Sequence, residues 1–288
     1  MFMNKKQYKI TFIDLFSGIG GFRLGMEKAG HICLGHCEID KFAEKSYRMM
    51  HDIKKGEWYA DDITKVSAKE LPKADCWCFG FPCTDVSIAG KRQGLQGKRS
   101  GLFFEVIRIL EETKKENKPE WLLIENVRNL LSSQKGFDFA EILIALDKVG
   151  YDAEWQVLDS ANFGVPQHRE RLYIIGHIRT KGRKMIFPIQ QKTRSEGMKQ
   201  IEYRVFDKNG ISPTIMTHGG GKYAIKVLNE KEKNARCLTP KECFRLQGFP
   251  DDYFEKAKKV NSNTQLYKQA GNNVTVNVVY EIAKKIGC

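Results

Sequence analysis

One thiol and one carboxyl group each lie shortly after an apolar run of the sequence. Cys83 lies in the stretch GFPCT after the apolar residues 76–79, and Glu125 follows WLLI in WLLIENV. Enzymes with α/β folds place catalytic groups at such strand ends. Cys83 could be a nucleophile, and Glu125 a general acid if burial raises its pKa. Taken alone, a cysteine is usually a small buried hydrophobe, and the carboxylate could be solvated or paired with a nearby arginine such as Arg128.

Three further features suit the binding of a ligand. Residues 14–22 (DLFSGIGGF) indicate a strand, a glycine-rich turn and a helix, which bring backbone close to a ligand. Arg23 takes the place of the third glycine of a dinucleotide motif, which argues against a nicotinamide cofactor. Glu38 could accept hydrogen bonds from ribose hydroxyls, and Asp62 is a similar acid or, equally, a helix cap.

The stretch QHRER contains two arginines, Arg169 and Arg171, at the start of an apolar run. At this spacing they share one face of a strand and could both point at an anionic or carbonyl-rich ligand. A surface turn held by salt bridges is the alternative.

Alternating strand and helix patterns must position these residues. This alternation predicts an α/β fold with a doubly wound, mostly parallel sheet. Asp40 and Asp138 are the expected caps of the helices at 40–50 and 137–149. The expected strands are 8–15, 31–38, 74–79, 120–124, 153–159 and 171–178, and the expected helices are 20–29, 40–50, 101–115 and 137–149.

The pattern changes after residue 180. Residues 180–235 are rich in Lys and Arg and carry short strand-like runs, which indicates a small, basic, β-rich lobe. TPKECFRLQ should form a helix, and a last helix should run from about residue 274 to 286. We therefore expect a catalytic domain at 1–182 plus 272–288, a small lobe at 183–243 and a connecting segment at 244–271.

Composition limits the class of protein. The 288 residues are 41% hydrophobic, so one large domain with a smaller lobe can bury its own core. The net charge of +13 favours a polyanionic partner, or only reflects lysines on solvated faces. The eight cysteines contain no C-x2-C pair, so reduced thiols and no metal are expected. The sequence contains no 18-residue apolar run, and we expect a cytoplasmic protein without a leader or a membrane partner.

The order of six motifs decides between these alternatives. DLFSGIGG, GFPC, ENV, QHRER, RCLTPKECFRLQGFPDDY and YKQAGNNVTVNVV follow one another along nearly the whole chain, apart from about residues 183–210. This ordered set closely resembles the bacterial and phage DNA cytosine-C5 methyltransferase family. The resemblance implies a methyltransferase fold related to the Rossmann fold, with a smaller target-recognition lobe and S-adenosylmethionine as methyl donor.

The resemblance also implies a role for individual residues. Cys83 matches the nucleophile, Glu125 matches the acid that protonates or hydrogen-bonds ring N3, and Arg169 and Arg171 match the arginines that orient the cytosine and the acid. A larger group matches positions around the methyl donor. Its members are Phe16, Gly18, Gly20, Glu38, Ile39, Asp62, Ile63, Pro82, Leu102, Asn272 and Val274.

The chemistry is consistent with these residue types. Cytosine C5 is a poor nucleophile, and addition of the Cys83 thiolate at C6 while N3 gains a proton converts C5 into a reactive enamine carbon. Loss of the C5 proton then releases the cysteine. The target atom is inaccessible in a duplex, so the base must be flipped into the site, and the glycine-rich stretch after Cys83 could close behind it.

The sequence departs from the family pattern in three places. Thr84 stands where the family usually has Gln, which affects expected DNA contacts more than the chemistry. Ile39 stands where some relatives carry an aromatic residue, so the packing of the adenine should differ. Only 64 residues separate Arg171 from Arg236, which predicts a compact lobe that reads a short site or needs a partner.

Other functions fit the sequence less well. A tRNA cytosine-C5 methyltransferase shares much of the motif pattern, but the basic lobe and the motif order favour duplex DNA. A DNA-binding protein on a retired scaffold would have lost Cys83 or Glu125, and a dehydrogenase would need the third glycine. We therefore expect a monomeric enzyme acting on double-stranded DNA, with a cognate restriction endonuclease as a candidate partner.

Overall fold

A seven-stranded sheet runs through the computed structural model, which describes residues 8–82, 101–179, 185–190, 205–206, 210–217, 225–229 and 234–286. Along the sheet the strands follow the order β3-β2-β1-β4-β5-β7-β6. All strands are parallel except β7, which runs antiparallel to both of its neighbours. The bounds are β1 Thr11–Leu15, β2 Ile32–Cys37, β3 Trp58–Ala60, β4 Cys76–Phe79, β5 Trp121–Val127, β6 Tyr151–Asp159 and β7 Glu170–Ile178.

Alternate residues of the central strands enter two different hydrophobic cores. In β1, Ile13 and Leu15 pack on one face of the sheet, and Phe12 packs on the other. In β4, Trp77 and Phe79 share the first face, and the neighbouring cysteines share the second. Successive strand side chains point to opposite faces, so nearly continuous apolar runs are buried on both sides.

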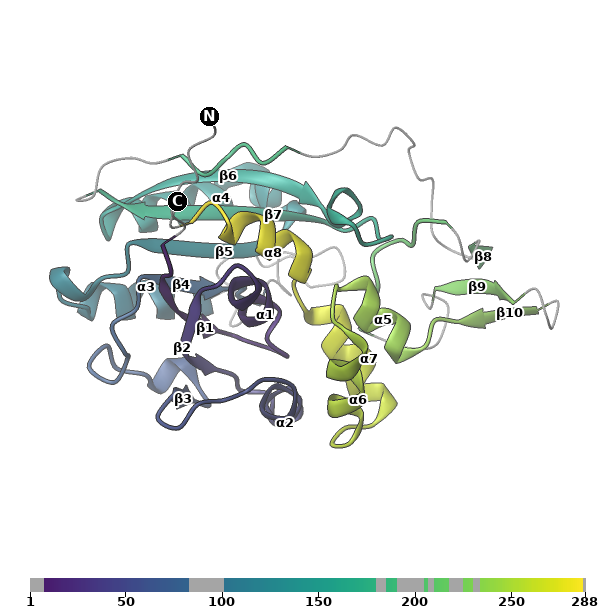
Figure 1. Ribbon diagram of the computed structural model, residues 1–288. Coiled ribbons are helices and arrows are strands. Elements are labelled where there is room, and N and C mark those ends of the chain that lie inside the picture. The colour runs from purple at the N-terminus through teal and green to yellow at the C-terminus, as the bar shows by residue number, and fades with distance from the viewer. Residues whose placement is uncertain are drawn as a thin grey trace, which may run out of the picture.

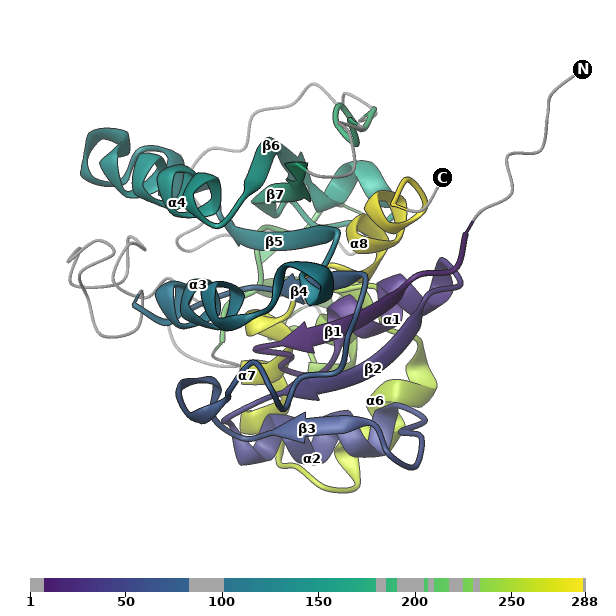
Figure 2. The same ribbon diagram turned by 90° about the vertical axis from the view of Figure 1, so that its left-hand side faces the viewer.

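Helices cover both faces of the sheet, as Figure 2 shows. The apolar sides of α3 and α4 complete the first core, and those of α1 and α8 complete the second. Residue Gly25 of α1 lies so close to α8 that a Cβ there would be 2.5 Å from Cγ1 of Val279. The bounds are α1 Gly21–Lys28, α3 Leu102–Glu112, α4 Phe137–Lys148 and α8 Val276–Ala283.

A third core joins the C-terminal helices to the glycine-rich turn. It contains Ile19 and Leu24 from the start of the chain, Ala43 and Met50 from α2, and apolar residues of three C-terminal helices. In Figure 1 these helices lie beside α2, at one end of the sheet. The bounds are α2 Lys41–Met50, α5 Pro240–Leu246, α6 Asp251–Lys258 and α7 Asn263–Asn272.

A second, small sheet lies apart from the main one (Figure 1). It consists of β8 Val205–Phe206, β9 Lys226–Asn229 and β10 Asn234–Cys237, in the order β10-β9-β8. These strands fall in the stretch for which the sequence predicts β structure. In the described parts of the chain, the longest helix is α4 with 12 residues, and no helix is both long and apolar enough to cross a membrane.

The predicted fold class is confirmed, with differences in detail. The short edge strand β3 and the helices α6 and α7 were not predicted, because β3 has only three residues and the C-terminal helices follow closely on Gly248 and Pro250. Asp40 caps α2 as expected, accepting from the backbone N–H of Phe42. The prediction for Asp138 was wrong: Gly136 occupies the cap position of α4, and the Asp138 carboxylate accepts a hydrogen bond from Ser133.

Candidate active site

The predicted site residues lie at the same edge of the sheet, just after β1, β2, β3 and β4 and within the last part of β5. The register pairs Ala60 with Cys37, Cys37 with Leu15, Leu15 with Phe79, and Phe79 with Ile124. These five residues form one row across the sheet. The residues that come next in the chain therefore meet at the carboxyl edge of the sheet, where α/β proteins bind their ligands; they are Asp61, Glu38, Phe16, Gly80 and Glu125.

The glycine-rich turn after β1 is held by the carboxylate of Glu38. Phe16, Gly18 and Gly20 all have positive φ, at 53°, 55° and 82°. Oε2 of Glu38 accepts a hydrogen bond from the Gly18 N–H at 2.7 Å, and Oε1 accepts from the Asp40 N–H at 2.6 Å. Burial raises the pKa of Glu38, while these two backbone hydrogen bonds act in the opposite direction.

Two buried polar atoms in and just before this turn have no partner in the described part of the chain. The buried hydroxyl of Ser17 and Oδ1 of Asp14 have no hydrogen-bond partner among the described residues. Burial holds the pKa of Asp14 well above its usual value. A Cβ at Gly18 would meet no described atom within 4 Å. The turn therefore has an open side, with groups available to a polar ligand.

Two predicted cofactor residues lie next to β3, and one lies beside Glu38. Asp62 caps the short helix Ile63–Lys65 by accepting a hydrogen bond from the Thr64 N–H at 3.0 Å. The alternative expectation for Asp62, a helix cap, is therefore confirmed. Hydrogen bonds from Thr64 lower the pKa of Asp62. The side chain of Ile63 is buried in the first core, whereas Ile39 is 73% exposed.

The C-terminal part of the predicted cofactor site lies against the start of α1. Asn272 is exposed at the end of α7, and Val274 is buried. A Cβ at Gly21 would be 2.5 Å from Nδ2 of Asn273 and 2.8 Å from Cγ2 of Val274. Only glycine fits at this contact, which brings the last predicted motif to the first.

Glu125 is held by Arg171 at the end of β5. Arg171 Nε lies 3.2 Å from Glu125 Oε1, and the Glu125 side chain is only 12% exposed. Burial raises the pKa of Glu125, and the charges of Arg171 and Arg169 oppose this rise. The alternative expectation, a carboxylate paired with a nearby arginine, therefore holds, but with Arg171; Arg128 pairs with Glu170 instead.

Arg169 and Arg171 are close in sequence but bind different parts of the protein. Arg169 is buried, and its Nη2 donates to the carbonyls of Gly271 and Asn273 at 3.1 and 2.8 Å. Its Nε and Nη1 have no partner among the described residues. Burial lowers the pKa of Arg169 to about 9, so the guanidinium is still charged at neutral pH. Arg169 thus links the region of Glu125 to the segment around Asn272.

The segment that leads to Cys83 is held by a residue to which the sequence analysis gave no role. Nδ2 of Asn126 donates to the Phe81 carbonyl at 3.2 Å, across the boundary between β5 and the end of β4. Pro82 is half-buried and is the last residue before Cys83, which lies outside the described residues. Leu102, also half-buried, begins α3.

Gln167 is a second residue whose contribution the sequence analysis missed. It is fully buried, accepts from the Ile215 N–H at 2.9 Å and donates to the Leu246 carbonyl at 2.9 Å. Its position in the motif QHRER was the available signal. Gln167 fixes residues 210–217, which lead toward the small sheet, next to Arg169.

Solved structures with the same arrangement are methyltransferases. The Entamoeba histolytica methyltransferase EhMeth matches with a TM-score of 0.75 at 19% identity, over 97% of this chain and 98% of that one. The Dnmt2 methyltransferase of S. pombe matches with a TM-score of 0.72 at 20% identity, over 96% of this chain and 98% of that one. The fold is that of the S-adenosylmethionine-dependent methyltransferases.

The sequence comparisons define the class further. The family model described as C-5 cytosine-specific DNA methylase matches residues 10–207 and 178–288. The Type II methyltransferase M.DsaV of Dactylococcopsis salina is 34% identical over 99% of this chain and 87% of its own length. M.HhaI of Haemophilus parahaemolyticus is 32% identical over 99% of this chain and 96% of its own length.

The chain therefore belongs to the C-5 cytosine-specific DNA methylase family. It is a DNA cytosine-C5 methyltransferase that uses S-adenosylmethionine, and DNA is its substrate. The predicted family, enzyme class and methyl donor are confirmed.

Proposed function

We propose that this methyltransferase acts on a flipped-out cytosine in a short, specific site of double-stranded DNA, through a covalent bond between Cys83 and C6. The observation that supports this most directly is the setting of Glu125. It is a buried carboxyl group with a raised pKa, held by Arg171, on the strand next to the one that leads to Cys83. This arrangement suits a group that must give a proton at neutral pH.

We assign the methyl donor to the glycine-rich turn and the residues around it. Three features fit a ligand that carries an amino acid and a ribose: the open side of Gly18, the carboxylate of Glu38 and the Ser17 hydroxyl, which has no partner among the described residues. S-adenosylmethionine supplies the methyl group from its sulfonium. The proposed contacts comprise Phe16, Gly18, Gly20, Glu38, Ile39, Asp62, Ile63, Pro82, Leu102, Asn272 and Val274.

The protein's own residues carry the remaining steps. The Cys83 thiolate forms a bond to C6 as the C5–C6 π electrons move into the ring and N3 takes a proton from Glu125. The resulting enamine carbon C5 would then be able to accept the methyl group that the cofactor, held at the glycine-rich turn, would supply. Loss of the C5 proton to a base restores the double bond, expels Cys83 as a thiolate and releases the N3 proton. Arg169 and Arg171 keep positive charge beside Glu125 throughout.

The names of the relatives suggest the biological setting. Both relatives are named as Type II methyltransferases. We propose that this chain likewise belongs to a restriction-modification system with a cognate endonuclease, and acts as a monomer in the cytoplasm. The proposed boundaries are a catalytic domain at 1–182 plus 272–288, a target-recognition lobe at 183–243 and a connecting segment at 244–271. The small sheet supports a β-rich lobe in this region.

Transfer of labelled methyl groups tests the proposed substrate. The purified chain is incubated with labelled S-adenosylmethionine and with duplex DNA, single-stranded DNA or tRNA, and modified cytosines are mapped after bisulfite treatment. We expect label in duplex DNA, at cytosines of one short sequence. Label in tRNA alone would contradict the duplex substrate, and label spread over all cytosines would contradict a specific site.

Replacing Glu38 tests the proposed cofactor site. Glu38→Gln keeps the shape of the side chain but removes a carboxylate oxygen that accepts the Gly18 N–H. Hydrogen bonds to charged groups contribute roughly 1.5–3 kcal/mol, so the Kd for S-adenosylhomocysteine should rise at least about 10-fold. Calorimetric titration measures it. Glu281→Gln removes the carboxylate that pairs with Lys284 near the end of α8, and should leave the Kd unchanged.

A further inference from the structure

The first residue after α2, His51, lies directly behind the glycine-rich turn. It is 6% exposed, and its Nε2 lies 2.9 Å from the carbonyl oxygen of Ile19. A carbonyl can only accept, so Nε2 carries the proton and donates it. Nδ1 is then the unprotonated nitrogen, and it is buried without a partner among the described residues. The position of the ring is therefore set by one hydrogen bond to the turn.

The imidazole ring also packs against the backbone of the turn. A Cβ at Gly20 would be 2.1 Å from Nε2 of His51, a distance that no side chain allows. The ring centroid lies 4.7 Å from that of Tyr47 and 5.4 Å from that of Tyr253. His51 thus fills the space between the turn, α2 and α6. Gly20 therefore cannot carry a side chain while the His51 ring occupies this space.

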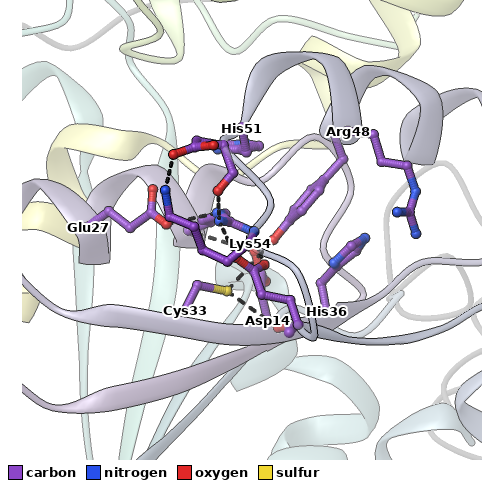
Figure 3. A network of polar contacts seen from close by, with 12 residues as sticks. Asp14, Glu27, Cys33, His36, Arg48, His51 and Lys54 are labelled. Carbon is purple, nitrogen blue, oxygen red and sulfur yellow. Dashed lines mark hydrogen bonds and ion pairs between the residues drawn. The ribbon is translucent and has the colours of Figure 1, made fainter.

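A buried ionic network holds the segment that follows His51. Arg23, which is 2% exposed, donates to the Asp52 carbonyl at 3.1 Å and to the two carboxylate oxygens of Glu57 at 2.8 and 3.1 Å. Its Nε donates to Glu27 at 2.8 Å. Figure 3 shows Glu27 and Lys54 in this region, with His51 close by. The turn is therefore tied to the segment at 51–57 on one side by His51 and on the other, through α1, by Arg23.

The turn needs such a tether because its backbone is strained. Phe16 is a non-glycine residue at positive φ, and it is followed by two glycines with positive φ. Conformations of this kind persist only where the surrounding structure over-determines them. The hydrogen bond to the Ile19 carbonyl fixes the Ile19–Gly20 peptide, which lies between the two glycines assigned to the cofactor, Gly18 and Gly20.

We propose that His51 is a positioning residue for S-adenosylmethionine, holding the glycine-rich turn in the conformation that binds the cofactor. The inference rests on the proposed cofactor site. If His51 is lost, the turn populates other conformations. The apparent affinity for the cofactor is then reduced in proportion to the fraction of molecules whose turn is still competent to bind. Because the bound state recovers the same geometry, the KM for the cofactor should change more than kcat. Burial lowers the pKa of His51 to about 3, so the ring stays a neutral donor across the working pH range.

Two substitutions separate the hydrogen bond from the packing. His51→Leu keeps apolar bulk between the tyrosines but removes the donor, and His51→Gln restores an N–H near the position of Nε2. We expect His51→Leu to raise the Kd for S-adenosylhomocysteine and the KM for S-adenosylmethionine about 10-fold, with kcat changed less than about threefold. His51→Gln should return both values to within about threefold of the wild type.

His31 is a matched control for a merely structural role. It is 4% exposed, and its Nε2 lies 2.9 Å from the carbonyl oxygen of Ala283, so its hydrogen bond goes to α8 and not to the glycine-rich turn. His31→Leu should lower the thermal unfolding midpoint, as His51→Leu does, but leave the Kd unchanged. Equal Kd values for His51→Leu and the wild type would overturn the proposal. So would an equal rise in His31→Leu, or failure of His51→Gln to recover affinity.

The Glu38 and Phe16 variants show which proposal has failed. If Glu38→Gln and Phe16→Ala weaken cofactor binding and His51→Leu does not, the cofactor site stands and the role of His51 is wrong. If none of the three changes the Kd, the assigned cofactor site itself is wrong, and the inference about His51 falls with it.

Discussion

Cys83→Ala should abolish methyl transfer to DNA, reducing the rate at least about 10⁴-fold, while leaving the Kd for S-adenosylhomocysteine unchanged. Loss of a catalytic nucleophile has effects of this size in other enzymes that work through a covalent intermediate. C5 would then have to attack as part of an aromatic ring, without prior addition at C6. Initial rates with labelled S-adenosylmethionine and duplex DNA measure the loss.

Trapping the covalent intermediate makes this test specific. Duplex DNA that carries 5-fluorocytosine at the target cannot lose a proton from C5, so the wild-type enzyme should stay attached to it on a denaturing gel. Cys83→Ala should give no adduct. Cys243→Ala, which removes a buried thiol of α5, should form the adduct normally and lose only stability. An adduct in Cys83→Ala would contradict the assignment.

Glu125→Gln should lower kcat by about 10²- to 10⁴-fold, the range typical of a lost general acid. It should also change the pH profile. Because burial raises the pKa of Glu125, the acid keeps its proton above the usual range for a carboxyl group. The value of kcat/KM should therefore fall about tenfold per pH unit once the pH exceeds this pKa, and a glutamine cannot show that alkaline limb.

The neighbouring strand offers a control for this experiment. Glu170 precedes Arg171, is 48% exposed and pairs with Arg128. Glu170→Gln changes the same functional group near the same arginine, and it should retain both the rate and the alkaline limb. If Glu125→Gln keeps the limb, another group must supply the proton. If it keeps the wild-type rate, N3 needs no acid at this site.

The sequence allowed the general form of the site to be predicted because the motifs lie at strand ends. The turn after β1, Glu38 after β2, Pro82 after β4 and Glu125 in β5 are local patterns, and parallel strands in register bring such ends together. The apolar runs that form the central strands are equally local. These parts of the fold are confirmed.

The contacts that hold the site depend on residues far apart in the chain, and no periodic pattern signals them. His51 contacts Ile19 across 32 positions, and Arg169 reaches Asn273 across 104. The spacing of Arg169 and Arg171 suggested one shared ligand, whereas within the protein each has its own partner. Pairings of this kind depend on how the layers pack, which a motif does not encode.

The contact between Gly21 and Val274 also has a consequence for the order in which the enzyme is completed during synthesis. The first motif of the proposed cofactor site is synthesised before the surface that covers α1, because that surface belongs to α8. Until α8 has been made, the apolar side of α1 has no cover and the glycine-rich turn lacks one wall. A nascent chain should therefore gain affinity for S-adenosylmethionine only after α8 has been made and has docked on α1.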